Sequence, residues 1–263
     1  MKSGTLVITS CGSPERLAFM FSKLLCTLLL LGSTSARASL EAALAAEANW
    51  NSPSALELFL AADRAKPNDP YILQKIAQQY ADLIADQLTN DARQDFAQAA
   101  LAYAQRATAL DANAVNVLSV AVAYGSLAAY SDISKKIQYS RLVRSEAERA
   151  LRLDPDYAWA HHVLGRWHYE IASLGFSARL LVRLWYGGLP AASFEESQRH
   201  LNQAIALEPK ALAHPLELGF AYAAAGQLAL AKIEWQRGLT MPALKKYDQP
   251  AKLRAQTALE ALN

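Results

Sequence analysis

The sequence is poor in cysteine. Its 263 residues include two, Cys11 and Cys26. Both fall within the first 38 residues, which we expect to be removed as a targeting segment. The rest of the chain then carries no thiol, which excludes disulfide bonds, thiolate metal sites and a cysteine nucleophile from it.

The sequence also lacks the short motifs of common enzyme classes. It contains no Gly-x-Ser-x-Gly motif, no phosphate-binding glycine loop, no His-Glu-x-x-His string and no carboxylates clustered at fixed spacing. No alternating strand pattern is present either. We therefore expect a helical protein that binds rather than catalyses, with no cofactor and no metal ion.

The first 38 residues have the order of a signal peptide. Lys23 precedes a short apolar run over residues 24–31, and a small-x-small site follows at Ala36-Arg37-Ala38. The run is too short to span a bilayer comfortably. We predict cleavage after Ala38 and export to a periplasmic or extracellular compartment. The true start of translation is either Met1 or Met20.

Removal of this segment changes the charge of the chain. The segment carries four cationic residues, Lys2, Arg16, Lys23 and Arg37, and the single anionic Glu15, so its loss takes the formal net charge from +2 to −1. A near-neutral chain gives no electrostatic argument for nucleic acid as a partner.

Four segments of the remaining chain resemble one another. Each has a helix-ending alanine, a turn rich in Pro, Asp or Asn, and a new helix with a small residue one turn before an aromatic residue or a histidine. The small residues are Ala77, Ala121, Gly165 and Gly219, which are 44, 44 and 54 residues apart. The simplest tetratricopeptide unit has about 34 residues, so these units are enlarged.

The periodicity predicts an all-α, tetratricopeptide-like helical-repeat solenoid over residues 39–263. Small residues allow close helix approach, and the second helix of each unit carries an apolar stripe. We expect about four helix pairs and a C-terminal capping helix, Pro250 to Leu262, with Leu253, Thr257 and Leu262 on one face.

The third unit contains an insert from Ser173 to Ser197 that accounts for its extra length. One interpretation is a cationic, aromatic lip over the concave groove, which would bind a carboxylate, a phosphate or an acidic peptide. The alternative is that Leu180, Leu181, Leu184 and Trp185 pack this unit against the next one.

Four histidines near this unit raise the question of a metal site. His161 and His168 share a helix face, but seven residues separate them by about 10 Å along the axis, too far for one ion. We therefore assign His161, His162, His168 and His200 to packing and capping.

From about Ser131 onward the chain resembles the regulator of microtubule dynamics proteins. The resemblance is carried by the string His161-His162-Val163-Leu164-Gly165-Arg166-Trp167 and by Gly187-Gly188-Leu189-Pro190. It implies an enlarged tetratricopeptide-like domain without enzymatic activity. Eukaryotic members are associated with microtubules, and some with mitochondrial membranes and lipid binding.

These observations leave three functional hypotheses. The first is a scaffold whose groove binds a peptide or protein partner. The second is a lipid-binding protein with an apolar tunnel between helix pairs, and the third is a microtubule regulator, which requires a cytosolic chain. The predicted partner-binding residues are Tyr80, Tyr124, Arg166, Trp167, Arg179, Arg183, Trp185 and Tyr186.

Overall fold

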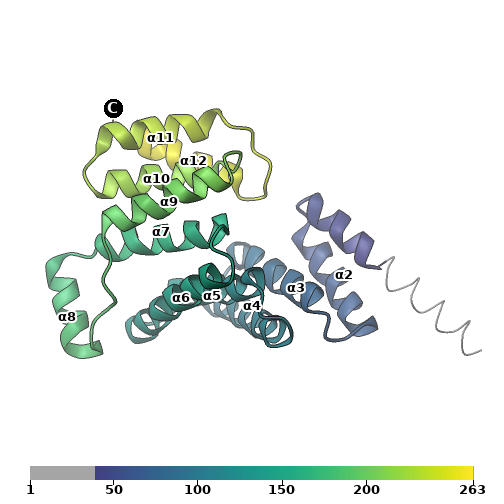
Figure 1. The fold of residues 1–263 in the computed structure, drawn as a ribbon. Coiled ribbons are helices and arrows are strands. Elements are labelled where there is room, and N and C mark those ends of the chain that lie inside the picture. The colour runs from purple at the N-terminus through teal and green to yellow at the C-terminus, as the bar shows by residue number, and fades with distance from the viewer. Residues whose placement is uncertain (1–38, 263) are drawn as a thin grey trace, which may run out of the picture.

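The computed structural model describes residues 39–262, and every regular element in that part is a helix (Figure 1). A first helix covers residues 39–48. The later elements are α2 (Ser52–Ala65), α3 (Pro70–Asp82), the 3-10 turn η1 (Ile84–Asp86), α4 (Asn90–Leu110), α5 (Ala114–Tyr130), α6 (Ile133–Leu153), α7 (Ala158–Ala172), α8 (Phe176–Tyr186), α9 (Phe194–Leu207), α10 (Ala213–Ala224), α11 (Leu228–Thr240) and α12 (Asp248–Glu260). The all-α prediction is confirmed. The predicted signal peptide and its cleavage site after Ala38 lie outside the described residues.

Short polar side chains fix where several helices begin. Asp69 accepts a hydrogen bond from the backbone N–H of Tyr71 at 3.1 Å, and Pro70 follows it at the first helical position of α3. Ser193 accepts one from the backbone N–H of Glu196 at 3.1 Å at the start of α9. These caps satisfy backbone donors that a helix leaves free in its first turn.

The predicted helix pairs are present as α3 with α4, α5 with α6, α7 with α9 and α10 with α11. Their four small residues, Ala77, Ala121, Gly165 and Gly219, are all buried, as close packing requires. The helix over residues 39–48 and α2 form one more hairpin ahead of the first pair (Figure 1). The structure therefore has the predicted repeats plus an N-terminal hairpin.

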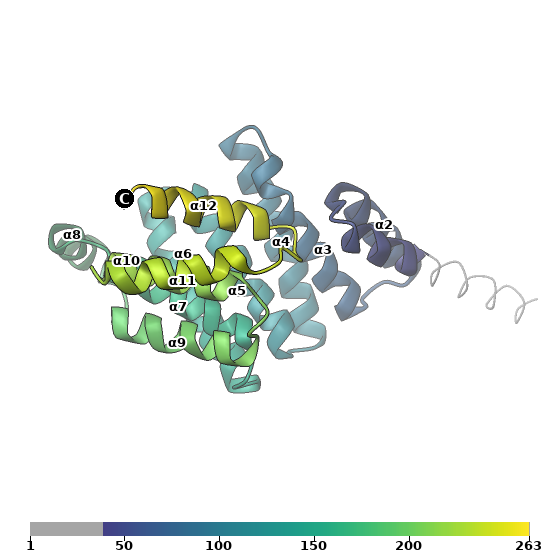
Figure 2. The ribbon, with the colours of Figure 1, turned by 90° about the horizontal axis from the view of Figure 1, so that it is seen from above.

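Helix α12 covers the end of the array by packing on α10 and α11 (Figure 2). The predicted buried face of this helix was right for one of its three residues. Leu253 is 66% exposed and Thr257 is exposed, whereas Leu262 packs against the last pair together with Ala255 and Leu259. Small side chains let α12 lie close to the last pair, which leaves the larger Leu253 on the outside.

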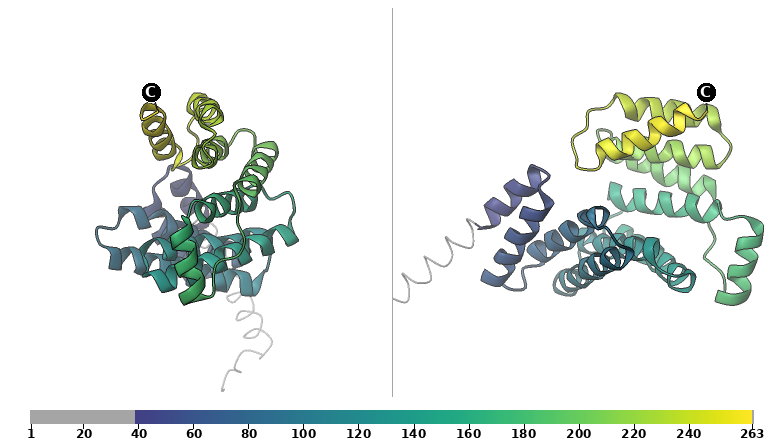
Figure 3. Two further views of the ribbon diagram at one scale, coloured as in Figure 1. Left: turned by 90° about the vertical axis from the view of Figure 1, so that its left-hand side faces the viewer. Right: turned by 180° about the vertical axis from the view of Figure 1, so that it is seen from behind.

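The segment before α12 crosses to the N-terminal part of the array (Figure 3). Nζ of Lys246 donates to Oγ of Ser52 at 3.1 Å and to the carbonyl of Asp82 at 2.9 Å, and the Tyr247 hydroxyl donates to the same carbonyl at 2.7 Å. Burial raises the pKa of the Asp82 carboxyl to about 6, although the nearby Lys246 ammonium opposes the shift. The two ends of the curved array are thus in direct contact.

None of the described helices combines the length and the apolar character that crossing a lipid bilayer requires.

Candidate functional site

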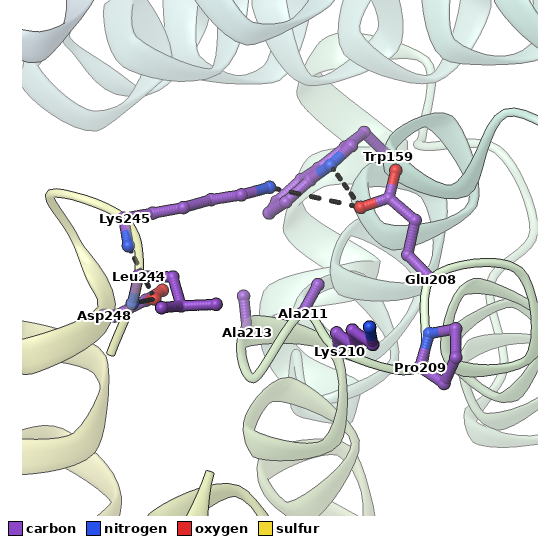
Figure 4. Close-up of a pocket in the computed structure, with 9 residues that line it drawn as sticks. All are labelled: Trp159, Glu208, Pro209, Lys210, Ala211, Ala213, Leu244, Lys245 and Asp248. Atoms are coloured by element: carbon purple, nitrogen blue, oxygen red, sulfur yellow. Dashed lines mark hydrogen bonds and ion pairs between the residues drawn. The ribbon is translucent and has the colours of Figure 1, made fainter. Parts of the chain in front are cut away.

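A hollow of about 370 Å³ lies between the turn that joins α9 to α10 and the segment that enters α12 (Figure 4). Three segments supply its walls, which are mostly apolar. The lining residues are Trp159, Glu208, Pro209, Lys210, Ala211, Ala213, Leu244, Lys245 and Asp248. The walls thus come from α7, from the turn before the last helix pair and from the approach to the capping helix.

The indole of Trp159 forms one side of the hollow and is held at both its edge and its face. Its Nε1–H donates to Oε2 of Glu208 at 3.1 Å. The ammonium of Lys245 lies 4.5 Å from the centre of the ring system and 4.0 Å from Oε2 of Glu208. Cation–π attraction and the ion pair therefore position Lys245 across the mouth of the hollow, as Figure 4 shows.

The opposite side is a short turn held rigid by Asp248. One carboxylate oxygen of Asp248 accepts from the backbone N–H groups of Leu244 at 2.7 Å and Lys245 at 2.8 Å. Asp248 is buried, whereas Leu244 is 62% exposed. The turn therefore presents a large apolar side chain to solvent in a fixed position beside the hollow.

A pair of histidines lies directly behind Trp159. The Nδ1 atoms of His162 and His214 are 3.0 Å apart, and the Trp159 ring centre lies 5.2 Å and 4.8 Å from the two imidazole centres. Burial lowers the pKa of His162 to about 4 and that of His214 to about 3. Both imidazoles are thus neutral at physiological pH, and one Nδ1–H donates to the other Nδ1.

A buried carboxylate ties α7, α10 and α12 together near this pair. Glu217 on α10 accepts from the Tyr169 hydroxyl at 2.8 Å and from Nη2 of Arg254 at 2.5 Å, with Nε of Arg166 at 3.9 Å. Burial opposes ionisation of Glu217, but the two guanidinium groups outweigh it and hold its pKa below the ordinary value. The capping helix is therefore held to the array by charge as well as by apolar packing.

Comparisons with known proteins agree with this architecture. The sequence profile described as "Regulator of microtubule dynamics protein 1-3" matches residues 39–263. The chain belongs to this family. It is 29% identical over 140 residues to regulator of microtubule dynamics protein 3 of Xenopus laevis, covering 52% of this chain and 30% of that protein. It is 26% identical over 113 residues to protein 1 of Bos taurus, covering 42% of this chain and 35% of that protein.

The chain thus spans about a third of the length of these curated relatives. Among solved structures, a tetratricopeptide protein of Thermus thermophilus superposes with a TM-score of 0.64 at 22% identity, over 86% of this chain and 99% of that one. This similarity confirms the predicted tetratricopeptide-like solenoid for this member of the regulator of microtubule dynamics family.

Two of the predicted partner-binding residues lie between helices of the N-terminal half. The Tyr80 ring stacks on Tyr103 at 5.8 Å and meets Phe96 edge-on at 5.6 Å. Tyr124 stacks on Tyr139 at 5.7 Å. Both tyrosines fill the groove between neighbouring helices, and neither lines the hollow described above.

Arg166 and Trp167 point in different directions from α7. Arg166 pairs with Glu170 at 2.8 Å and contributes to the charge around Glu217. Trp167 is 4% exposed, and its Nε1–H donates to the Ser140 carbonyl at 2.9 Å. Trp167 is therefore a packing residue in this structure.

The insert forms α8, which projects from the array beyond the C-terminal end of α7 (Figure 1). Trp159 is near the other end of α7, about 20 Å away along the helix axis, so the insert does not border this hollow. Its role as a lip over the concave groove stays a prediction. The alternative, in which apolar side chains of the insert pack against the next unit, is wrong. Four of them are exposed: Leu180 44%, Leu181 57%, Leu184 69% and Trp185 76%.

The side of α8 opposite these four exposed side chains contacts the rest of the protein. Val182 is its one buried side chain among those described, and Arg179 donates to the Ala172 carbonyl. Arg141 of α6 donates to the carbonyls of Tyr186 and Gly188, where Gly187 and Gly188 adopt positive φ values of 73° and 84° and end the helix. Arg183 is exposed. Arg179, Arg183, Trp185 and Tyr186 are thus brought together on one helix, apart from the other predicted residues.

Sequence reasoning missed Leu244 and Glu208 as parts of a site. They lie in turns, about 35 residues apart in sequence, and become neighbours only because α12 folds back over the last pair. A pair of lysines at 245 and 246 next to an apolar residue was the available signal.

Proposed function

We propose that the protein is a non-enzymatic scaffold that binds an extended segment of a protein partner through the hollow beside Trp159. The observation that carries this proposal is the combination of an apolar hollow with an exposed Leu244 that is fixed in position at its rim. Preorganised apolar side chains bind with little loss of conformational entropy. The hollow accommodates one large apolar side chain of the partner, and its size is typical of small ligand sites.

A displayed random-peptide library selected against the purified chain tests this proposal. Selected peptides should share a large apolar residue, and their affinity can be measured by fluorescence anisotropy. Leu244→Ser should weaken binding by about tenfold or more, since full burial of a leucine contributes about 1.5–3 kcal/mol. The matched control is Leu228→Ser, which changes a 45% exposed leucine outside the hollow. Equal affinity of both variants for the selected peptides would refute the proposal.

Export is a second part of the proposal and rests on the signal-peptide order of residues 1–38. Cell fractionation followed by mass spectrometry of the mature N-terminus should find the chain beginning at Ser39 outside the cytoplasm. A cytosolic chain that retains these residues would refute export. It would also favour the microtubule relation that the names of the relatives carry, which co-sedimentation of the chain with polymerised tubulin measures directly.

The exposed face of α8 favours a further candidate function, attachment to an anionic membrane surface. Its large apolar side chains lie on one arc of the helix, at positions 180, 181, 184 and 185. The helix also carries Arg179 and Arg183 and no acidic residue. Amphipathic helices with leucine and tryptophan on one face and arginine on the other bind at the interface of anionic bilayers.

Vesicle flotation tests this attachment. The chain should float with phosphatidylcholine vesicles that contain phosphatidylglycerol and less with phosphatidylcholine alone. Leu184→Ser should reduce flotation, whereas Leu253→Ser should leave it unchanged, because Leu253 lies on α12 and not on α8. The two leucines are a matched pair, since Leu184 is 69% exposed and Leu253 is 66% exposed. Flotation that both substitutions leave intact would contradict a role for α8. The separate hypothesis of a lipid tunnel stays a prediction, and native mass spectrometry of the purified chain would detect a bound lipid.

A further inference from the structure

Two histidines and a glutamate from different helices of the third unit converge on one point. His168 comes from α7, and Glu196 and His200 come one turn apart from α9. One potential ligand atom of each side chain lies within 4.8 Å of the other two. Both histidines are buried, at 6% and 7% exposure, and the point opens into a hollow of about 520 Å³.

A third histidine fixes which nitrogen of His200 faces this point. Nε2 of His161 lies 3.0 Å from the Pro155 carbonyl, which can only accept a hydrogen bond, so His161 carries its proton on Nε2. Its Nδ1 is then an acceptor, to which the Nδ1–H of His200 donates a hydrogen bond at 2.8 Å. Nε2 of His200 is therefore unprotonated, and its lone pair is directed at this point. Metal-binding histidines are oriented in this way, by donating their second ring N–H to a fixed acceptor.

The second imidazole has an unsatisfied atom. Nδ1 of His168 is buried and has no hydrogen-bond partner within residues 39–262. A buried polar atom without a partner is destabilising, and a bound ligand is one way to satisfy it. Burial and the neighbouring guanidinium groups lower the pKa values of His168 and His200, that of His200 to about 3.

The charged groups around the point set the conditions for an ion. Nη2 of Arg199 lies 2.9 Å from Nε2 of His200 and 2.7 Å from Oε2 of Glu196, so a cation must displace it. Arg199 is 58% exposed and can turn into solvent. Arg144 also lines the hollow, but Glu148 pairs with it at 2.6 Å. Arg152 adds a further positive charge at the rim.

We propose that His168, Glu196 and His200 form a binding site for a divalent transition-metal ion of the zinc class. Two imidazoles and one carboxylate suit this class, whereas magnesium and calcium prefer a shell of oxygen atoms. Ligand distances of about 2.0–2.2 Å require the three atoms to move closer together, which rotation of the half-exposed Glu196 supplies. The hollow leaves a coordination position open to water or a further ligand.

Titration of the purified chain, without an added histidine tag, with Co²⁺ tests the site through visible absorption of the bound ion. One equivalent should bind, Zn²⁺ should displace it, and Zn²⁺ should raise the melting temperature because it joins α7 to α9. Cobalt should also quench tryptophan fluorescence, since the Trp167 ring meets His168 edge-on at 5.1 Å.

Single substitutions distinguish the proposed metal ligands from the residues beside them. Glu196→Gln should weaken binding tenfold or more, while Glu195→Gln, an adjacent carboxylate on the same helix, should leave it unchanged. Arg199→Gln should tighten binding, because it removes the group that competes with the ion. Circular dichroism confirms that each variant is folded. The proposal is overturned if Co²⁺ does not bind at one equivalent, if Glu196→Gln binds like the native chain, or if His162→Gln abolishes binding instead.

Discussion

Gly219 offers a direct test of the close helix approach on which the repeat packing depends. A Cβ atom added at Gly219 would lie 2.3 Å from Cδ1 and 2.4 Å from Nε1 of Trp235. Trp235 is 2% exposed, and its ring packs against Phe220 at a centroid distance of 5.1 Å, so it has little room to move. The helix pair α10–α11 must therefore separate, or the indole must leave its position, to accommodate Gly219→Ala.

The magnitude follows from two opposing effects. Overpacking of a well-packed core costs about 1–3 kcal/mol. Replacing glycine by alanine inside a helix stabilises it by about 1 kcal/mol. Since the contact involves a rigid, buried ring, we expect the upper part of the overpacking range and a net loss of about 1–2 kcal/mol. The same substitution at Gly125 should instead increase the free energy of unfolding, because the new Cβ would lie 3.8 Å from Cγ2 of Val143, which is an ordinary van der Waals contact.

Urea unfolding followed by circular dichroism and by tryptophan fluorescence measures both variants. Gly219→Ala should lower the free energy of unfolding and Gly125→Ala should raise it, with coincident transitions by the two probes showing that the array unfolds as one unit. In a Trp235→Leu background, Gly219→Ala should cost less, because the smaller side chain leaves space. The reasoning fails if Gly219→Ala is as stable as the native chain or if both substitutions shift stability in the same direction.

Two further predictions concern titratable groups. Burial lowers three histidine pKa values from 6.5, to about 4 for His162 and to about 3 for His200 and His214. Between these values and 6.5 the unfolded chain binds protons that the folded chain does not, so the free energy of unfolding should fall as the pH drops from 7 to 5. Near pH 5 the decrease should be at most about 2–3 kcal/mol per pH unit, after subtraction of the opposite effect of Asp82, whose pKa is raised by folding. Urea midpoints measured across this range test the prediction, and a flat profile would contradict it. Glu217→Gln should destabilise the chain by about 1–3 kcal/mol, because it leaves buried hydrogen-bonding groups poorly paired, whereas Glu170→Gln, in an exposed pair, should cost less than about 1 kcal/mol in the same unfolding experiment.

The repeat architecture was predictable from sequence because it depends on local patterns. The small residues, the apolar stripes and the capped turns each specify one helix or one turn, and together they locate the four predicted helix pairs, although not the N-terminal hairpin. The orientation of α8 was not predictable in this way. Its apolar arc looks like that of a helix with a buried face, and only the contacts of Val182 and Arg179 show that the opposite side is attached. Binding to a partner or a membrane and packing in a core leave the same pattern in sequence.

The contact between the two ends of the array was equally hidden. Lys246 and Tyr247 meet Ser52 and Asp82 across 164 to 194 residues, and no repeat pattern encodes that distance. It results from the accumulated curvature of the helix pairs, which is a sum of small rotations. The hollow beside Trp159 depends on the same segment, since Leu244 and Lys245 immediately precede the contact residues.

The histidines show that distances along one helix do not describe how side chains from two helices converge. His161 and His168 are about 10 Å apart along α7, which is too far for a shared ion. His200 of α9 lies between them, with its ring centre 5.1 Å from that of His161 and 5.8 Å from that of His168. Gly165 makes this possible, because its missing side chain lets Leu201 of α9, one residue after His200, approach α7. The small residue that marks the repeat therefore also places His200 beside His168, and the proposed metal site depends on the packing of the unit.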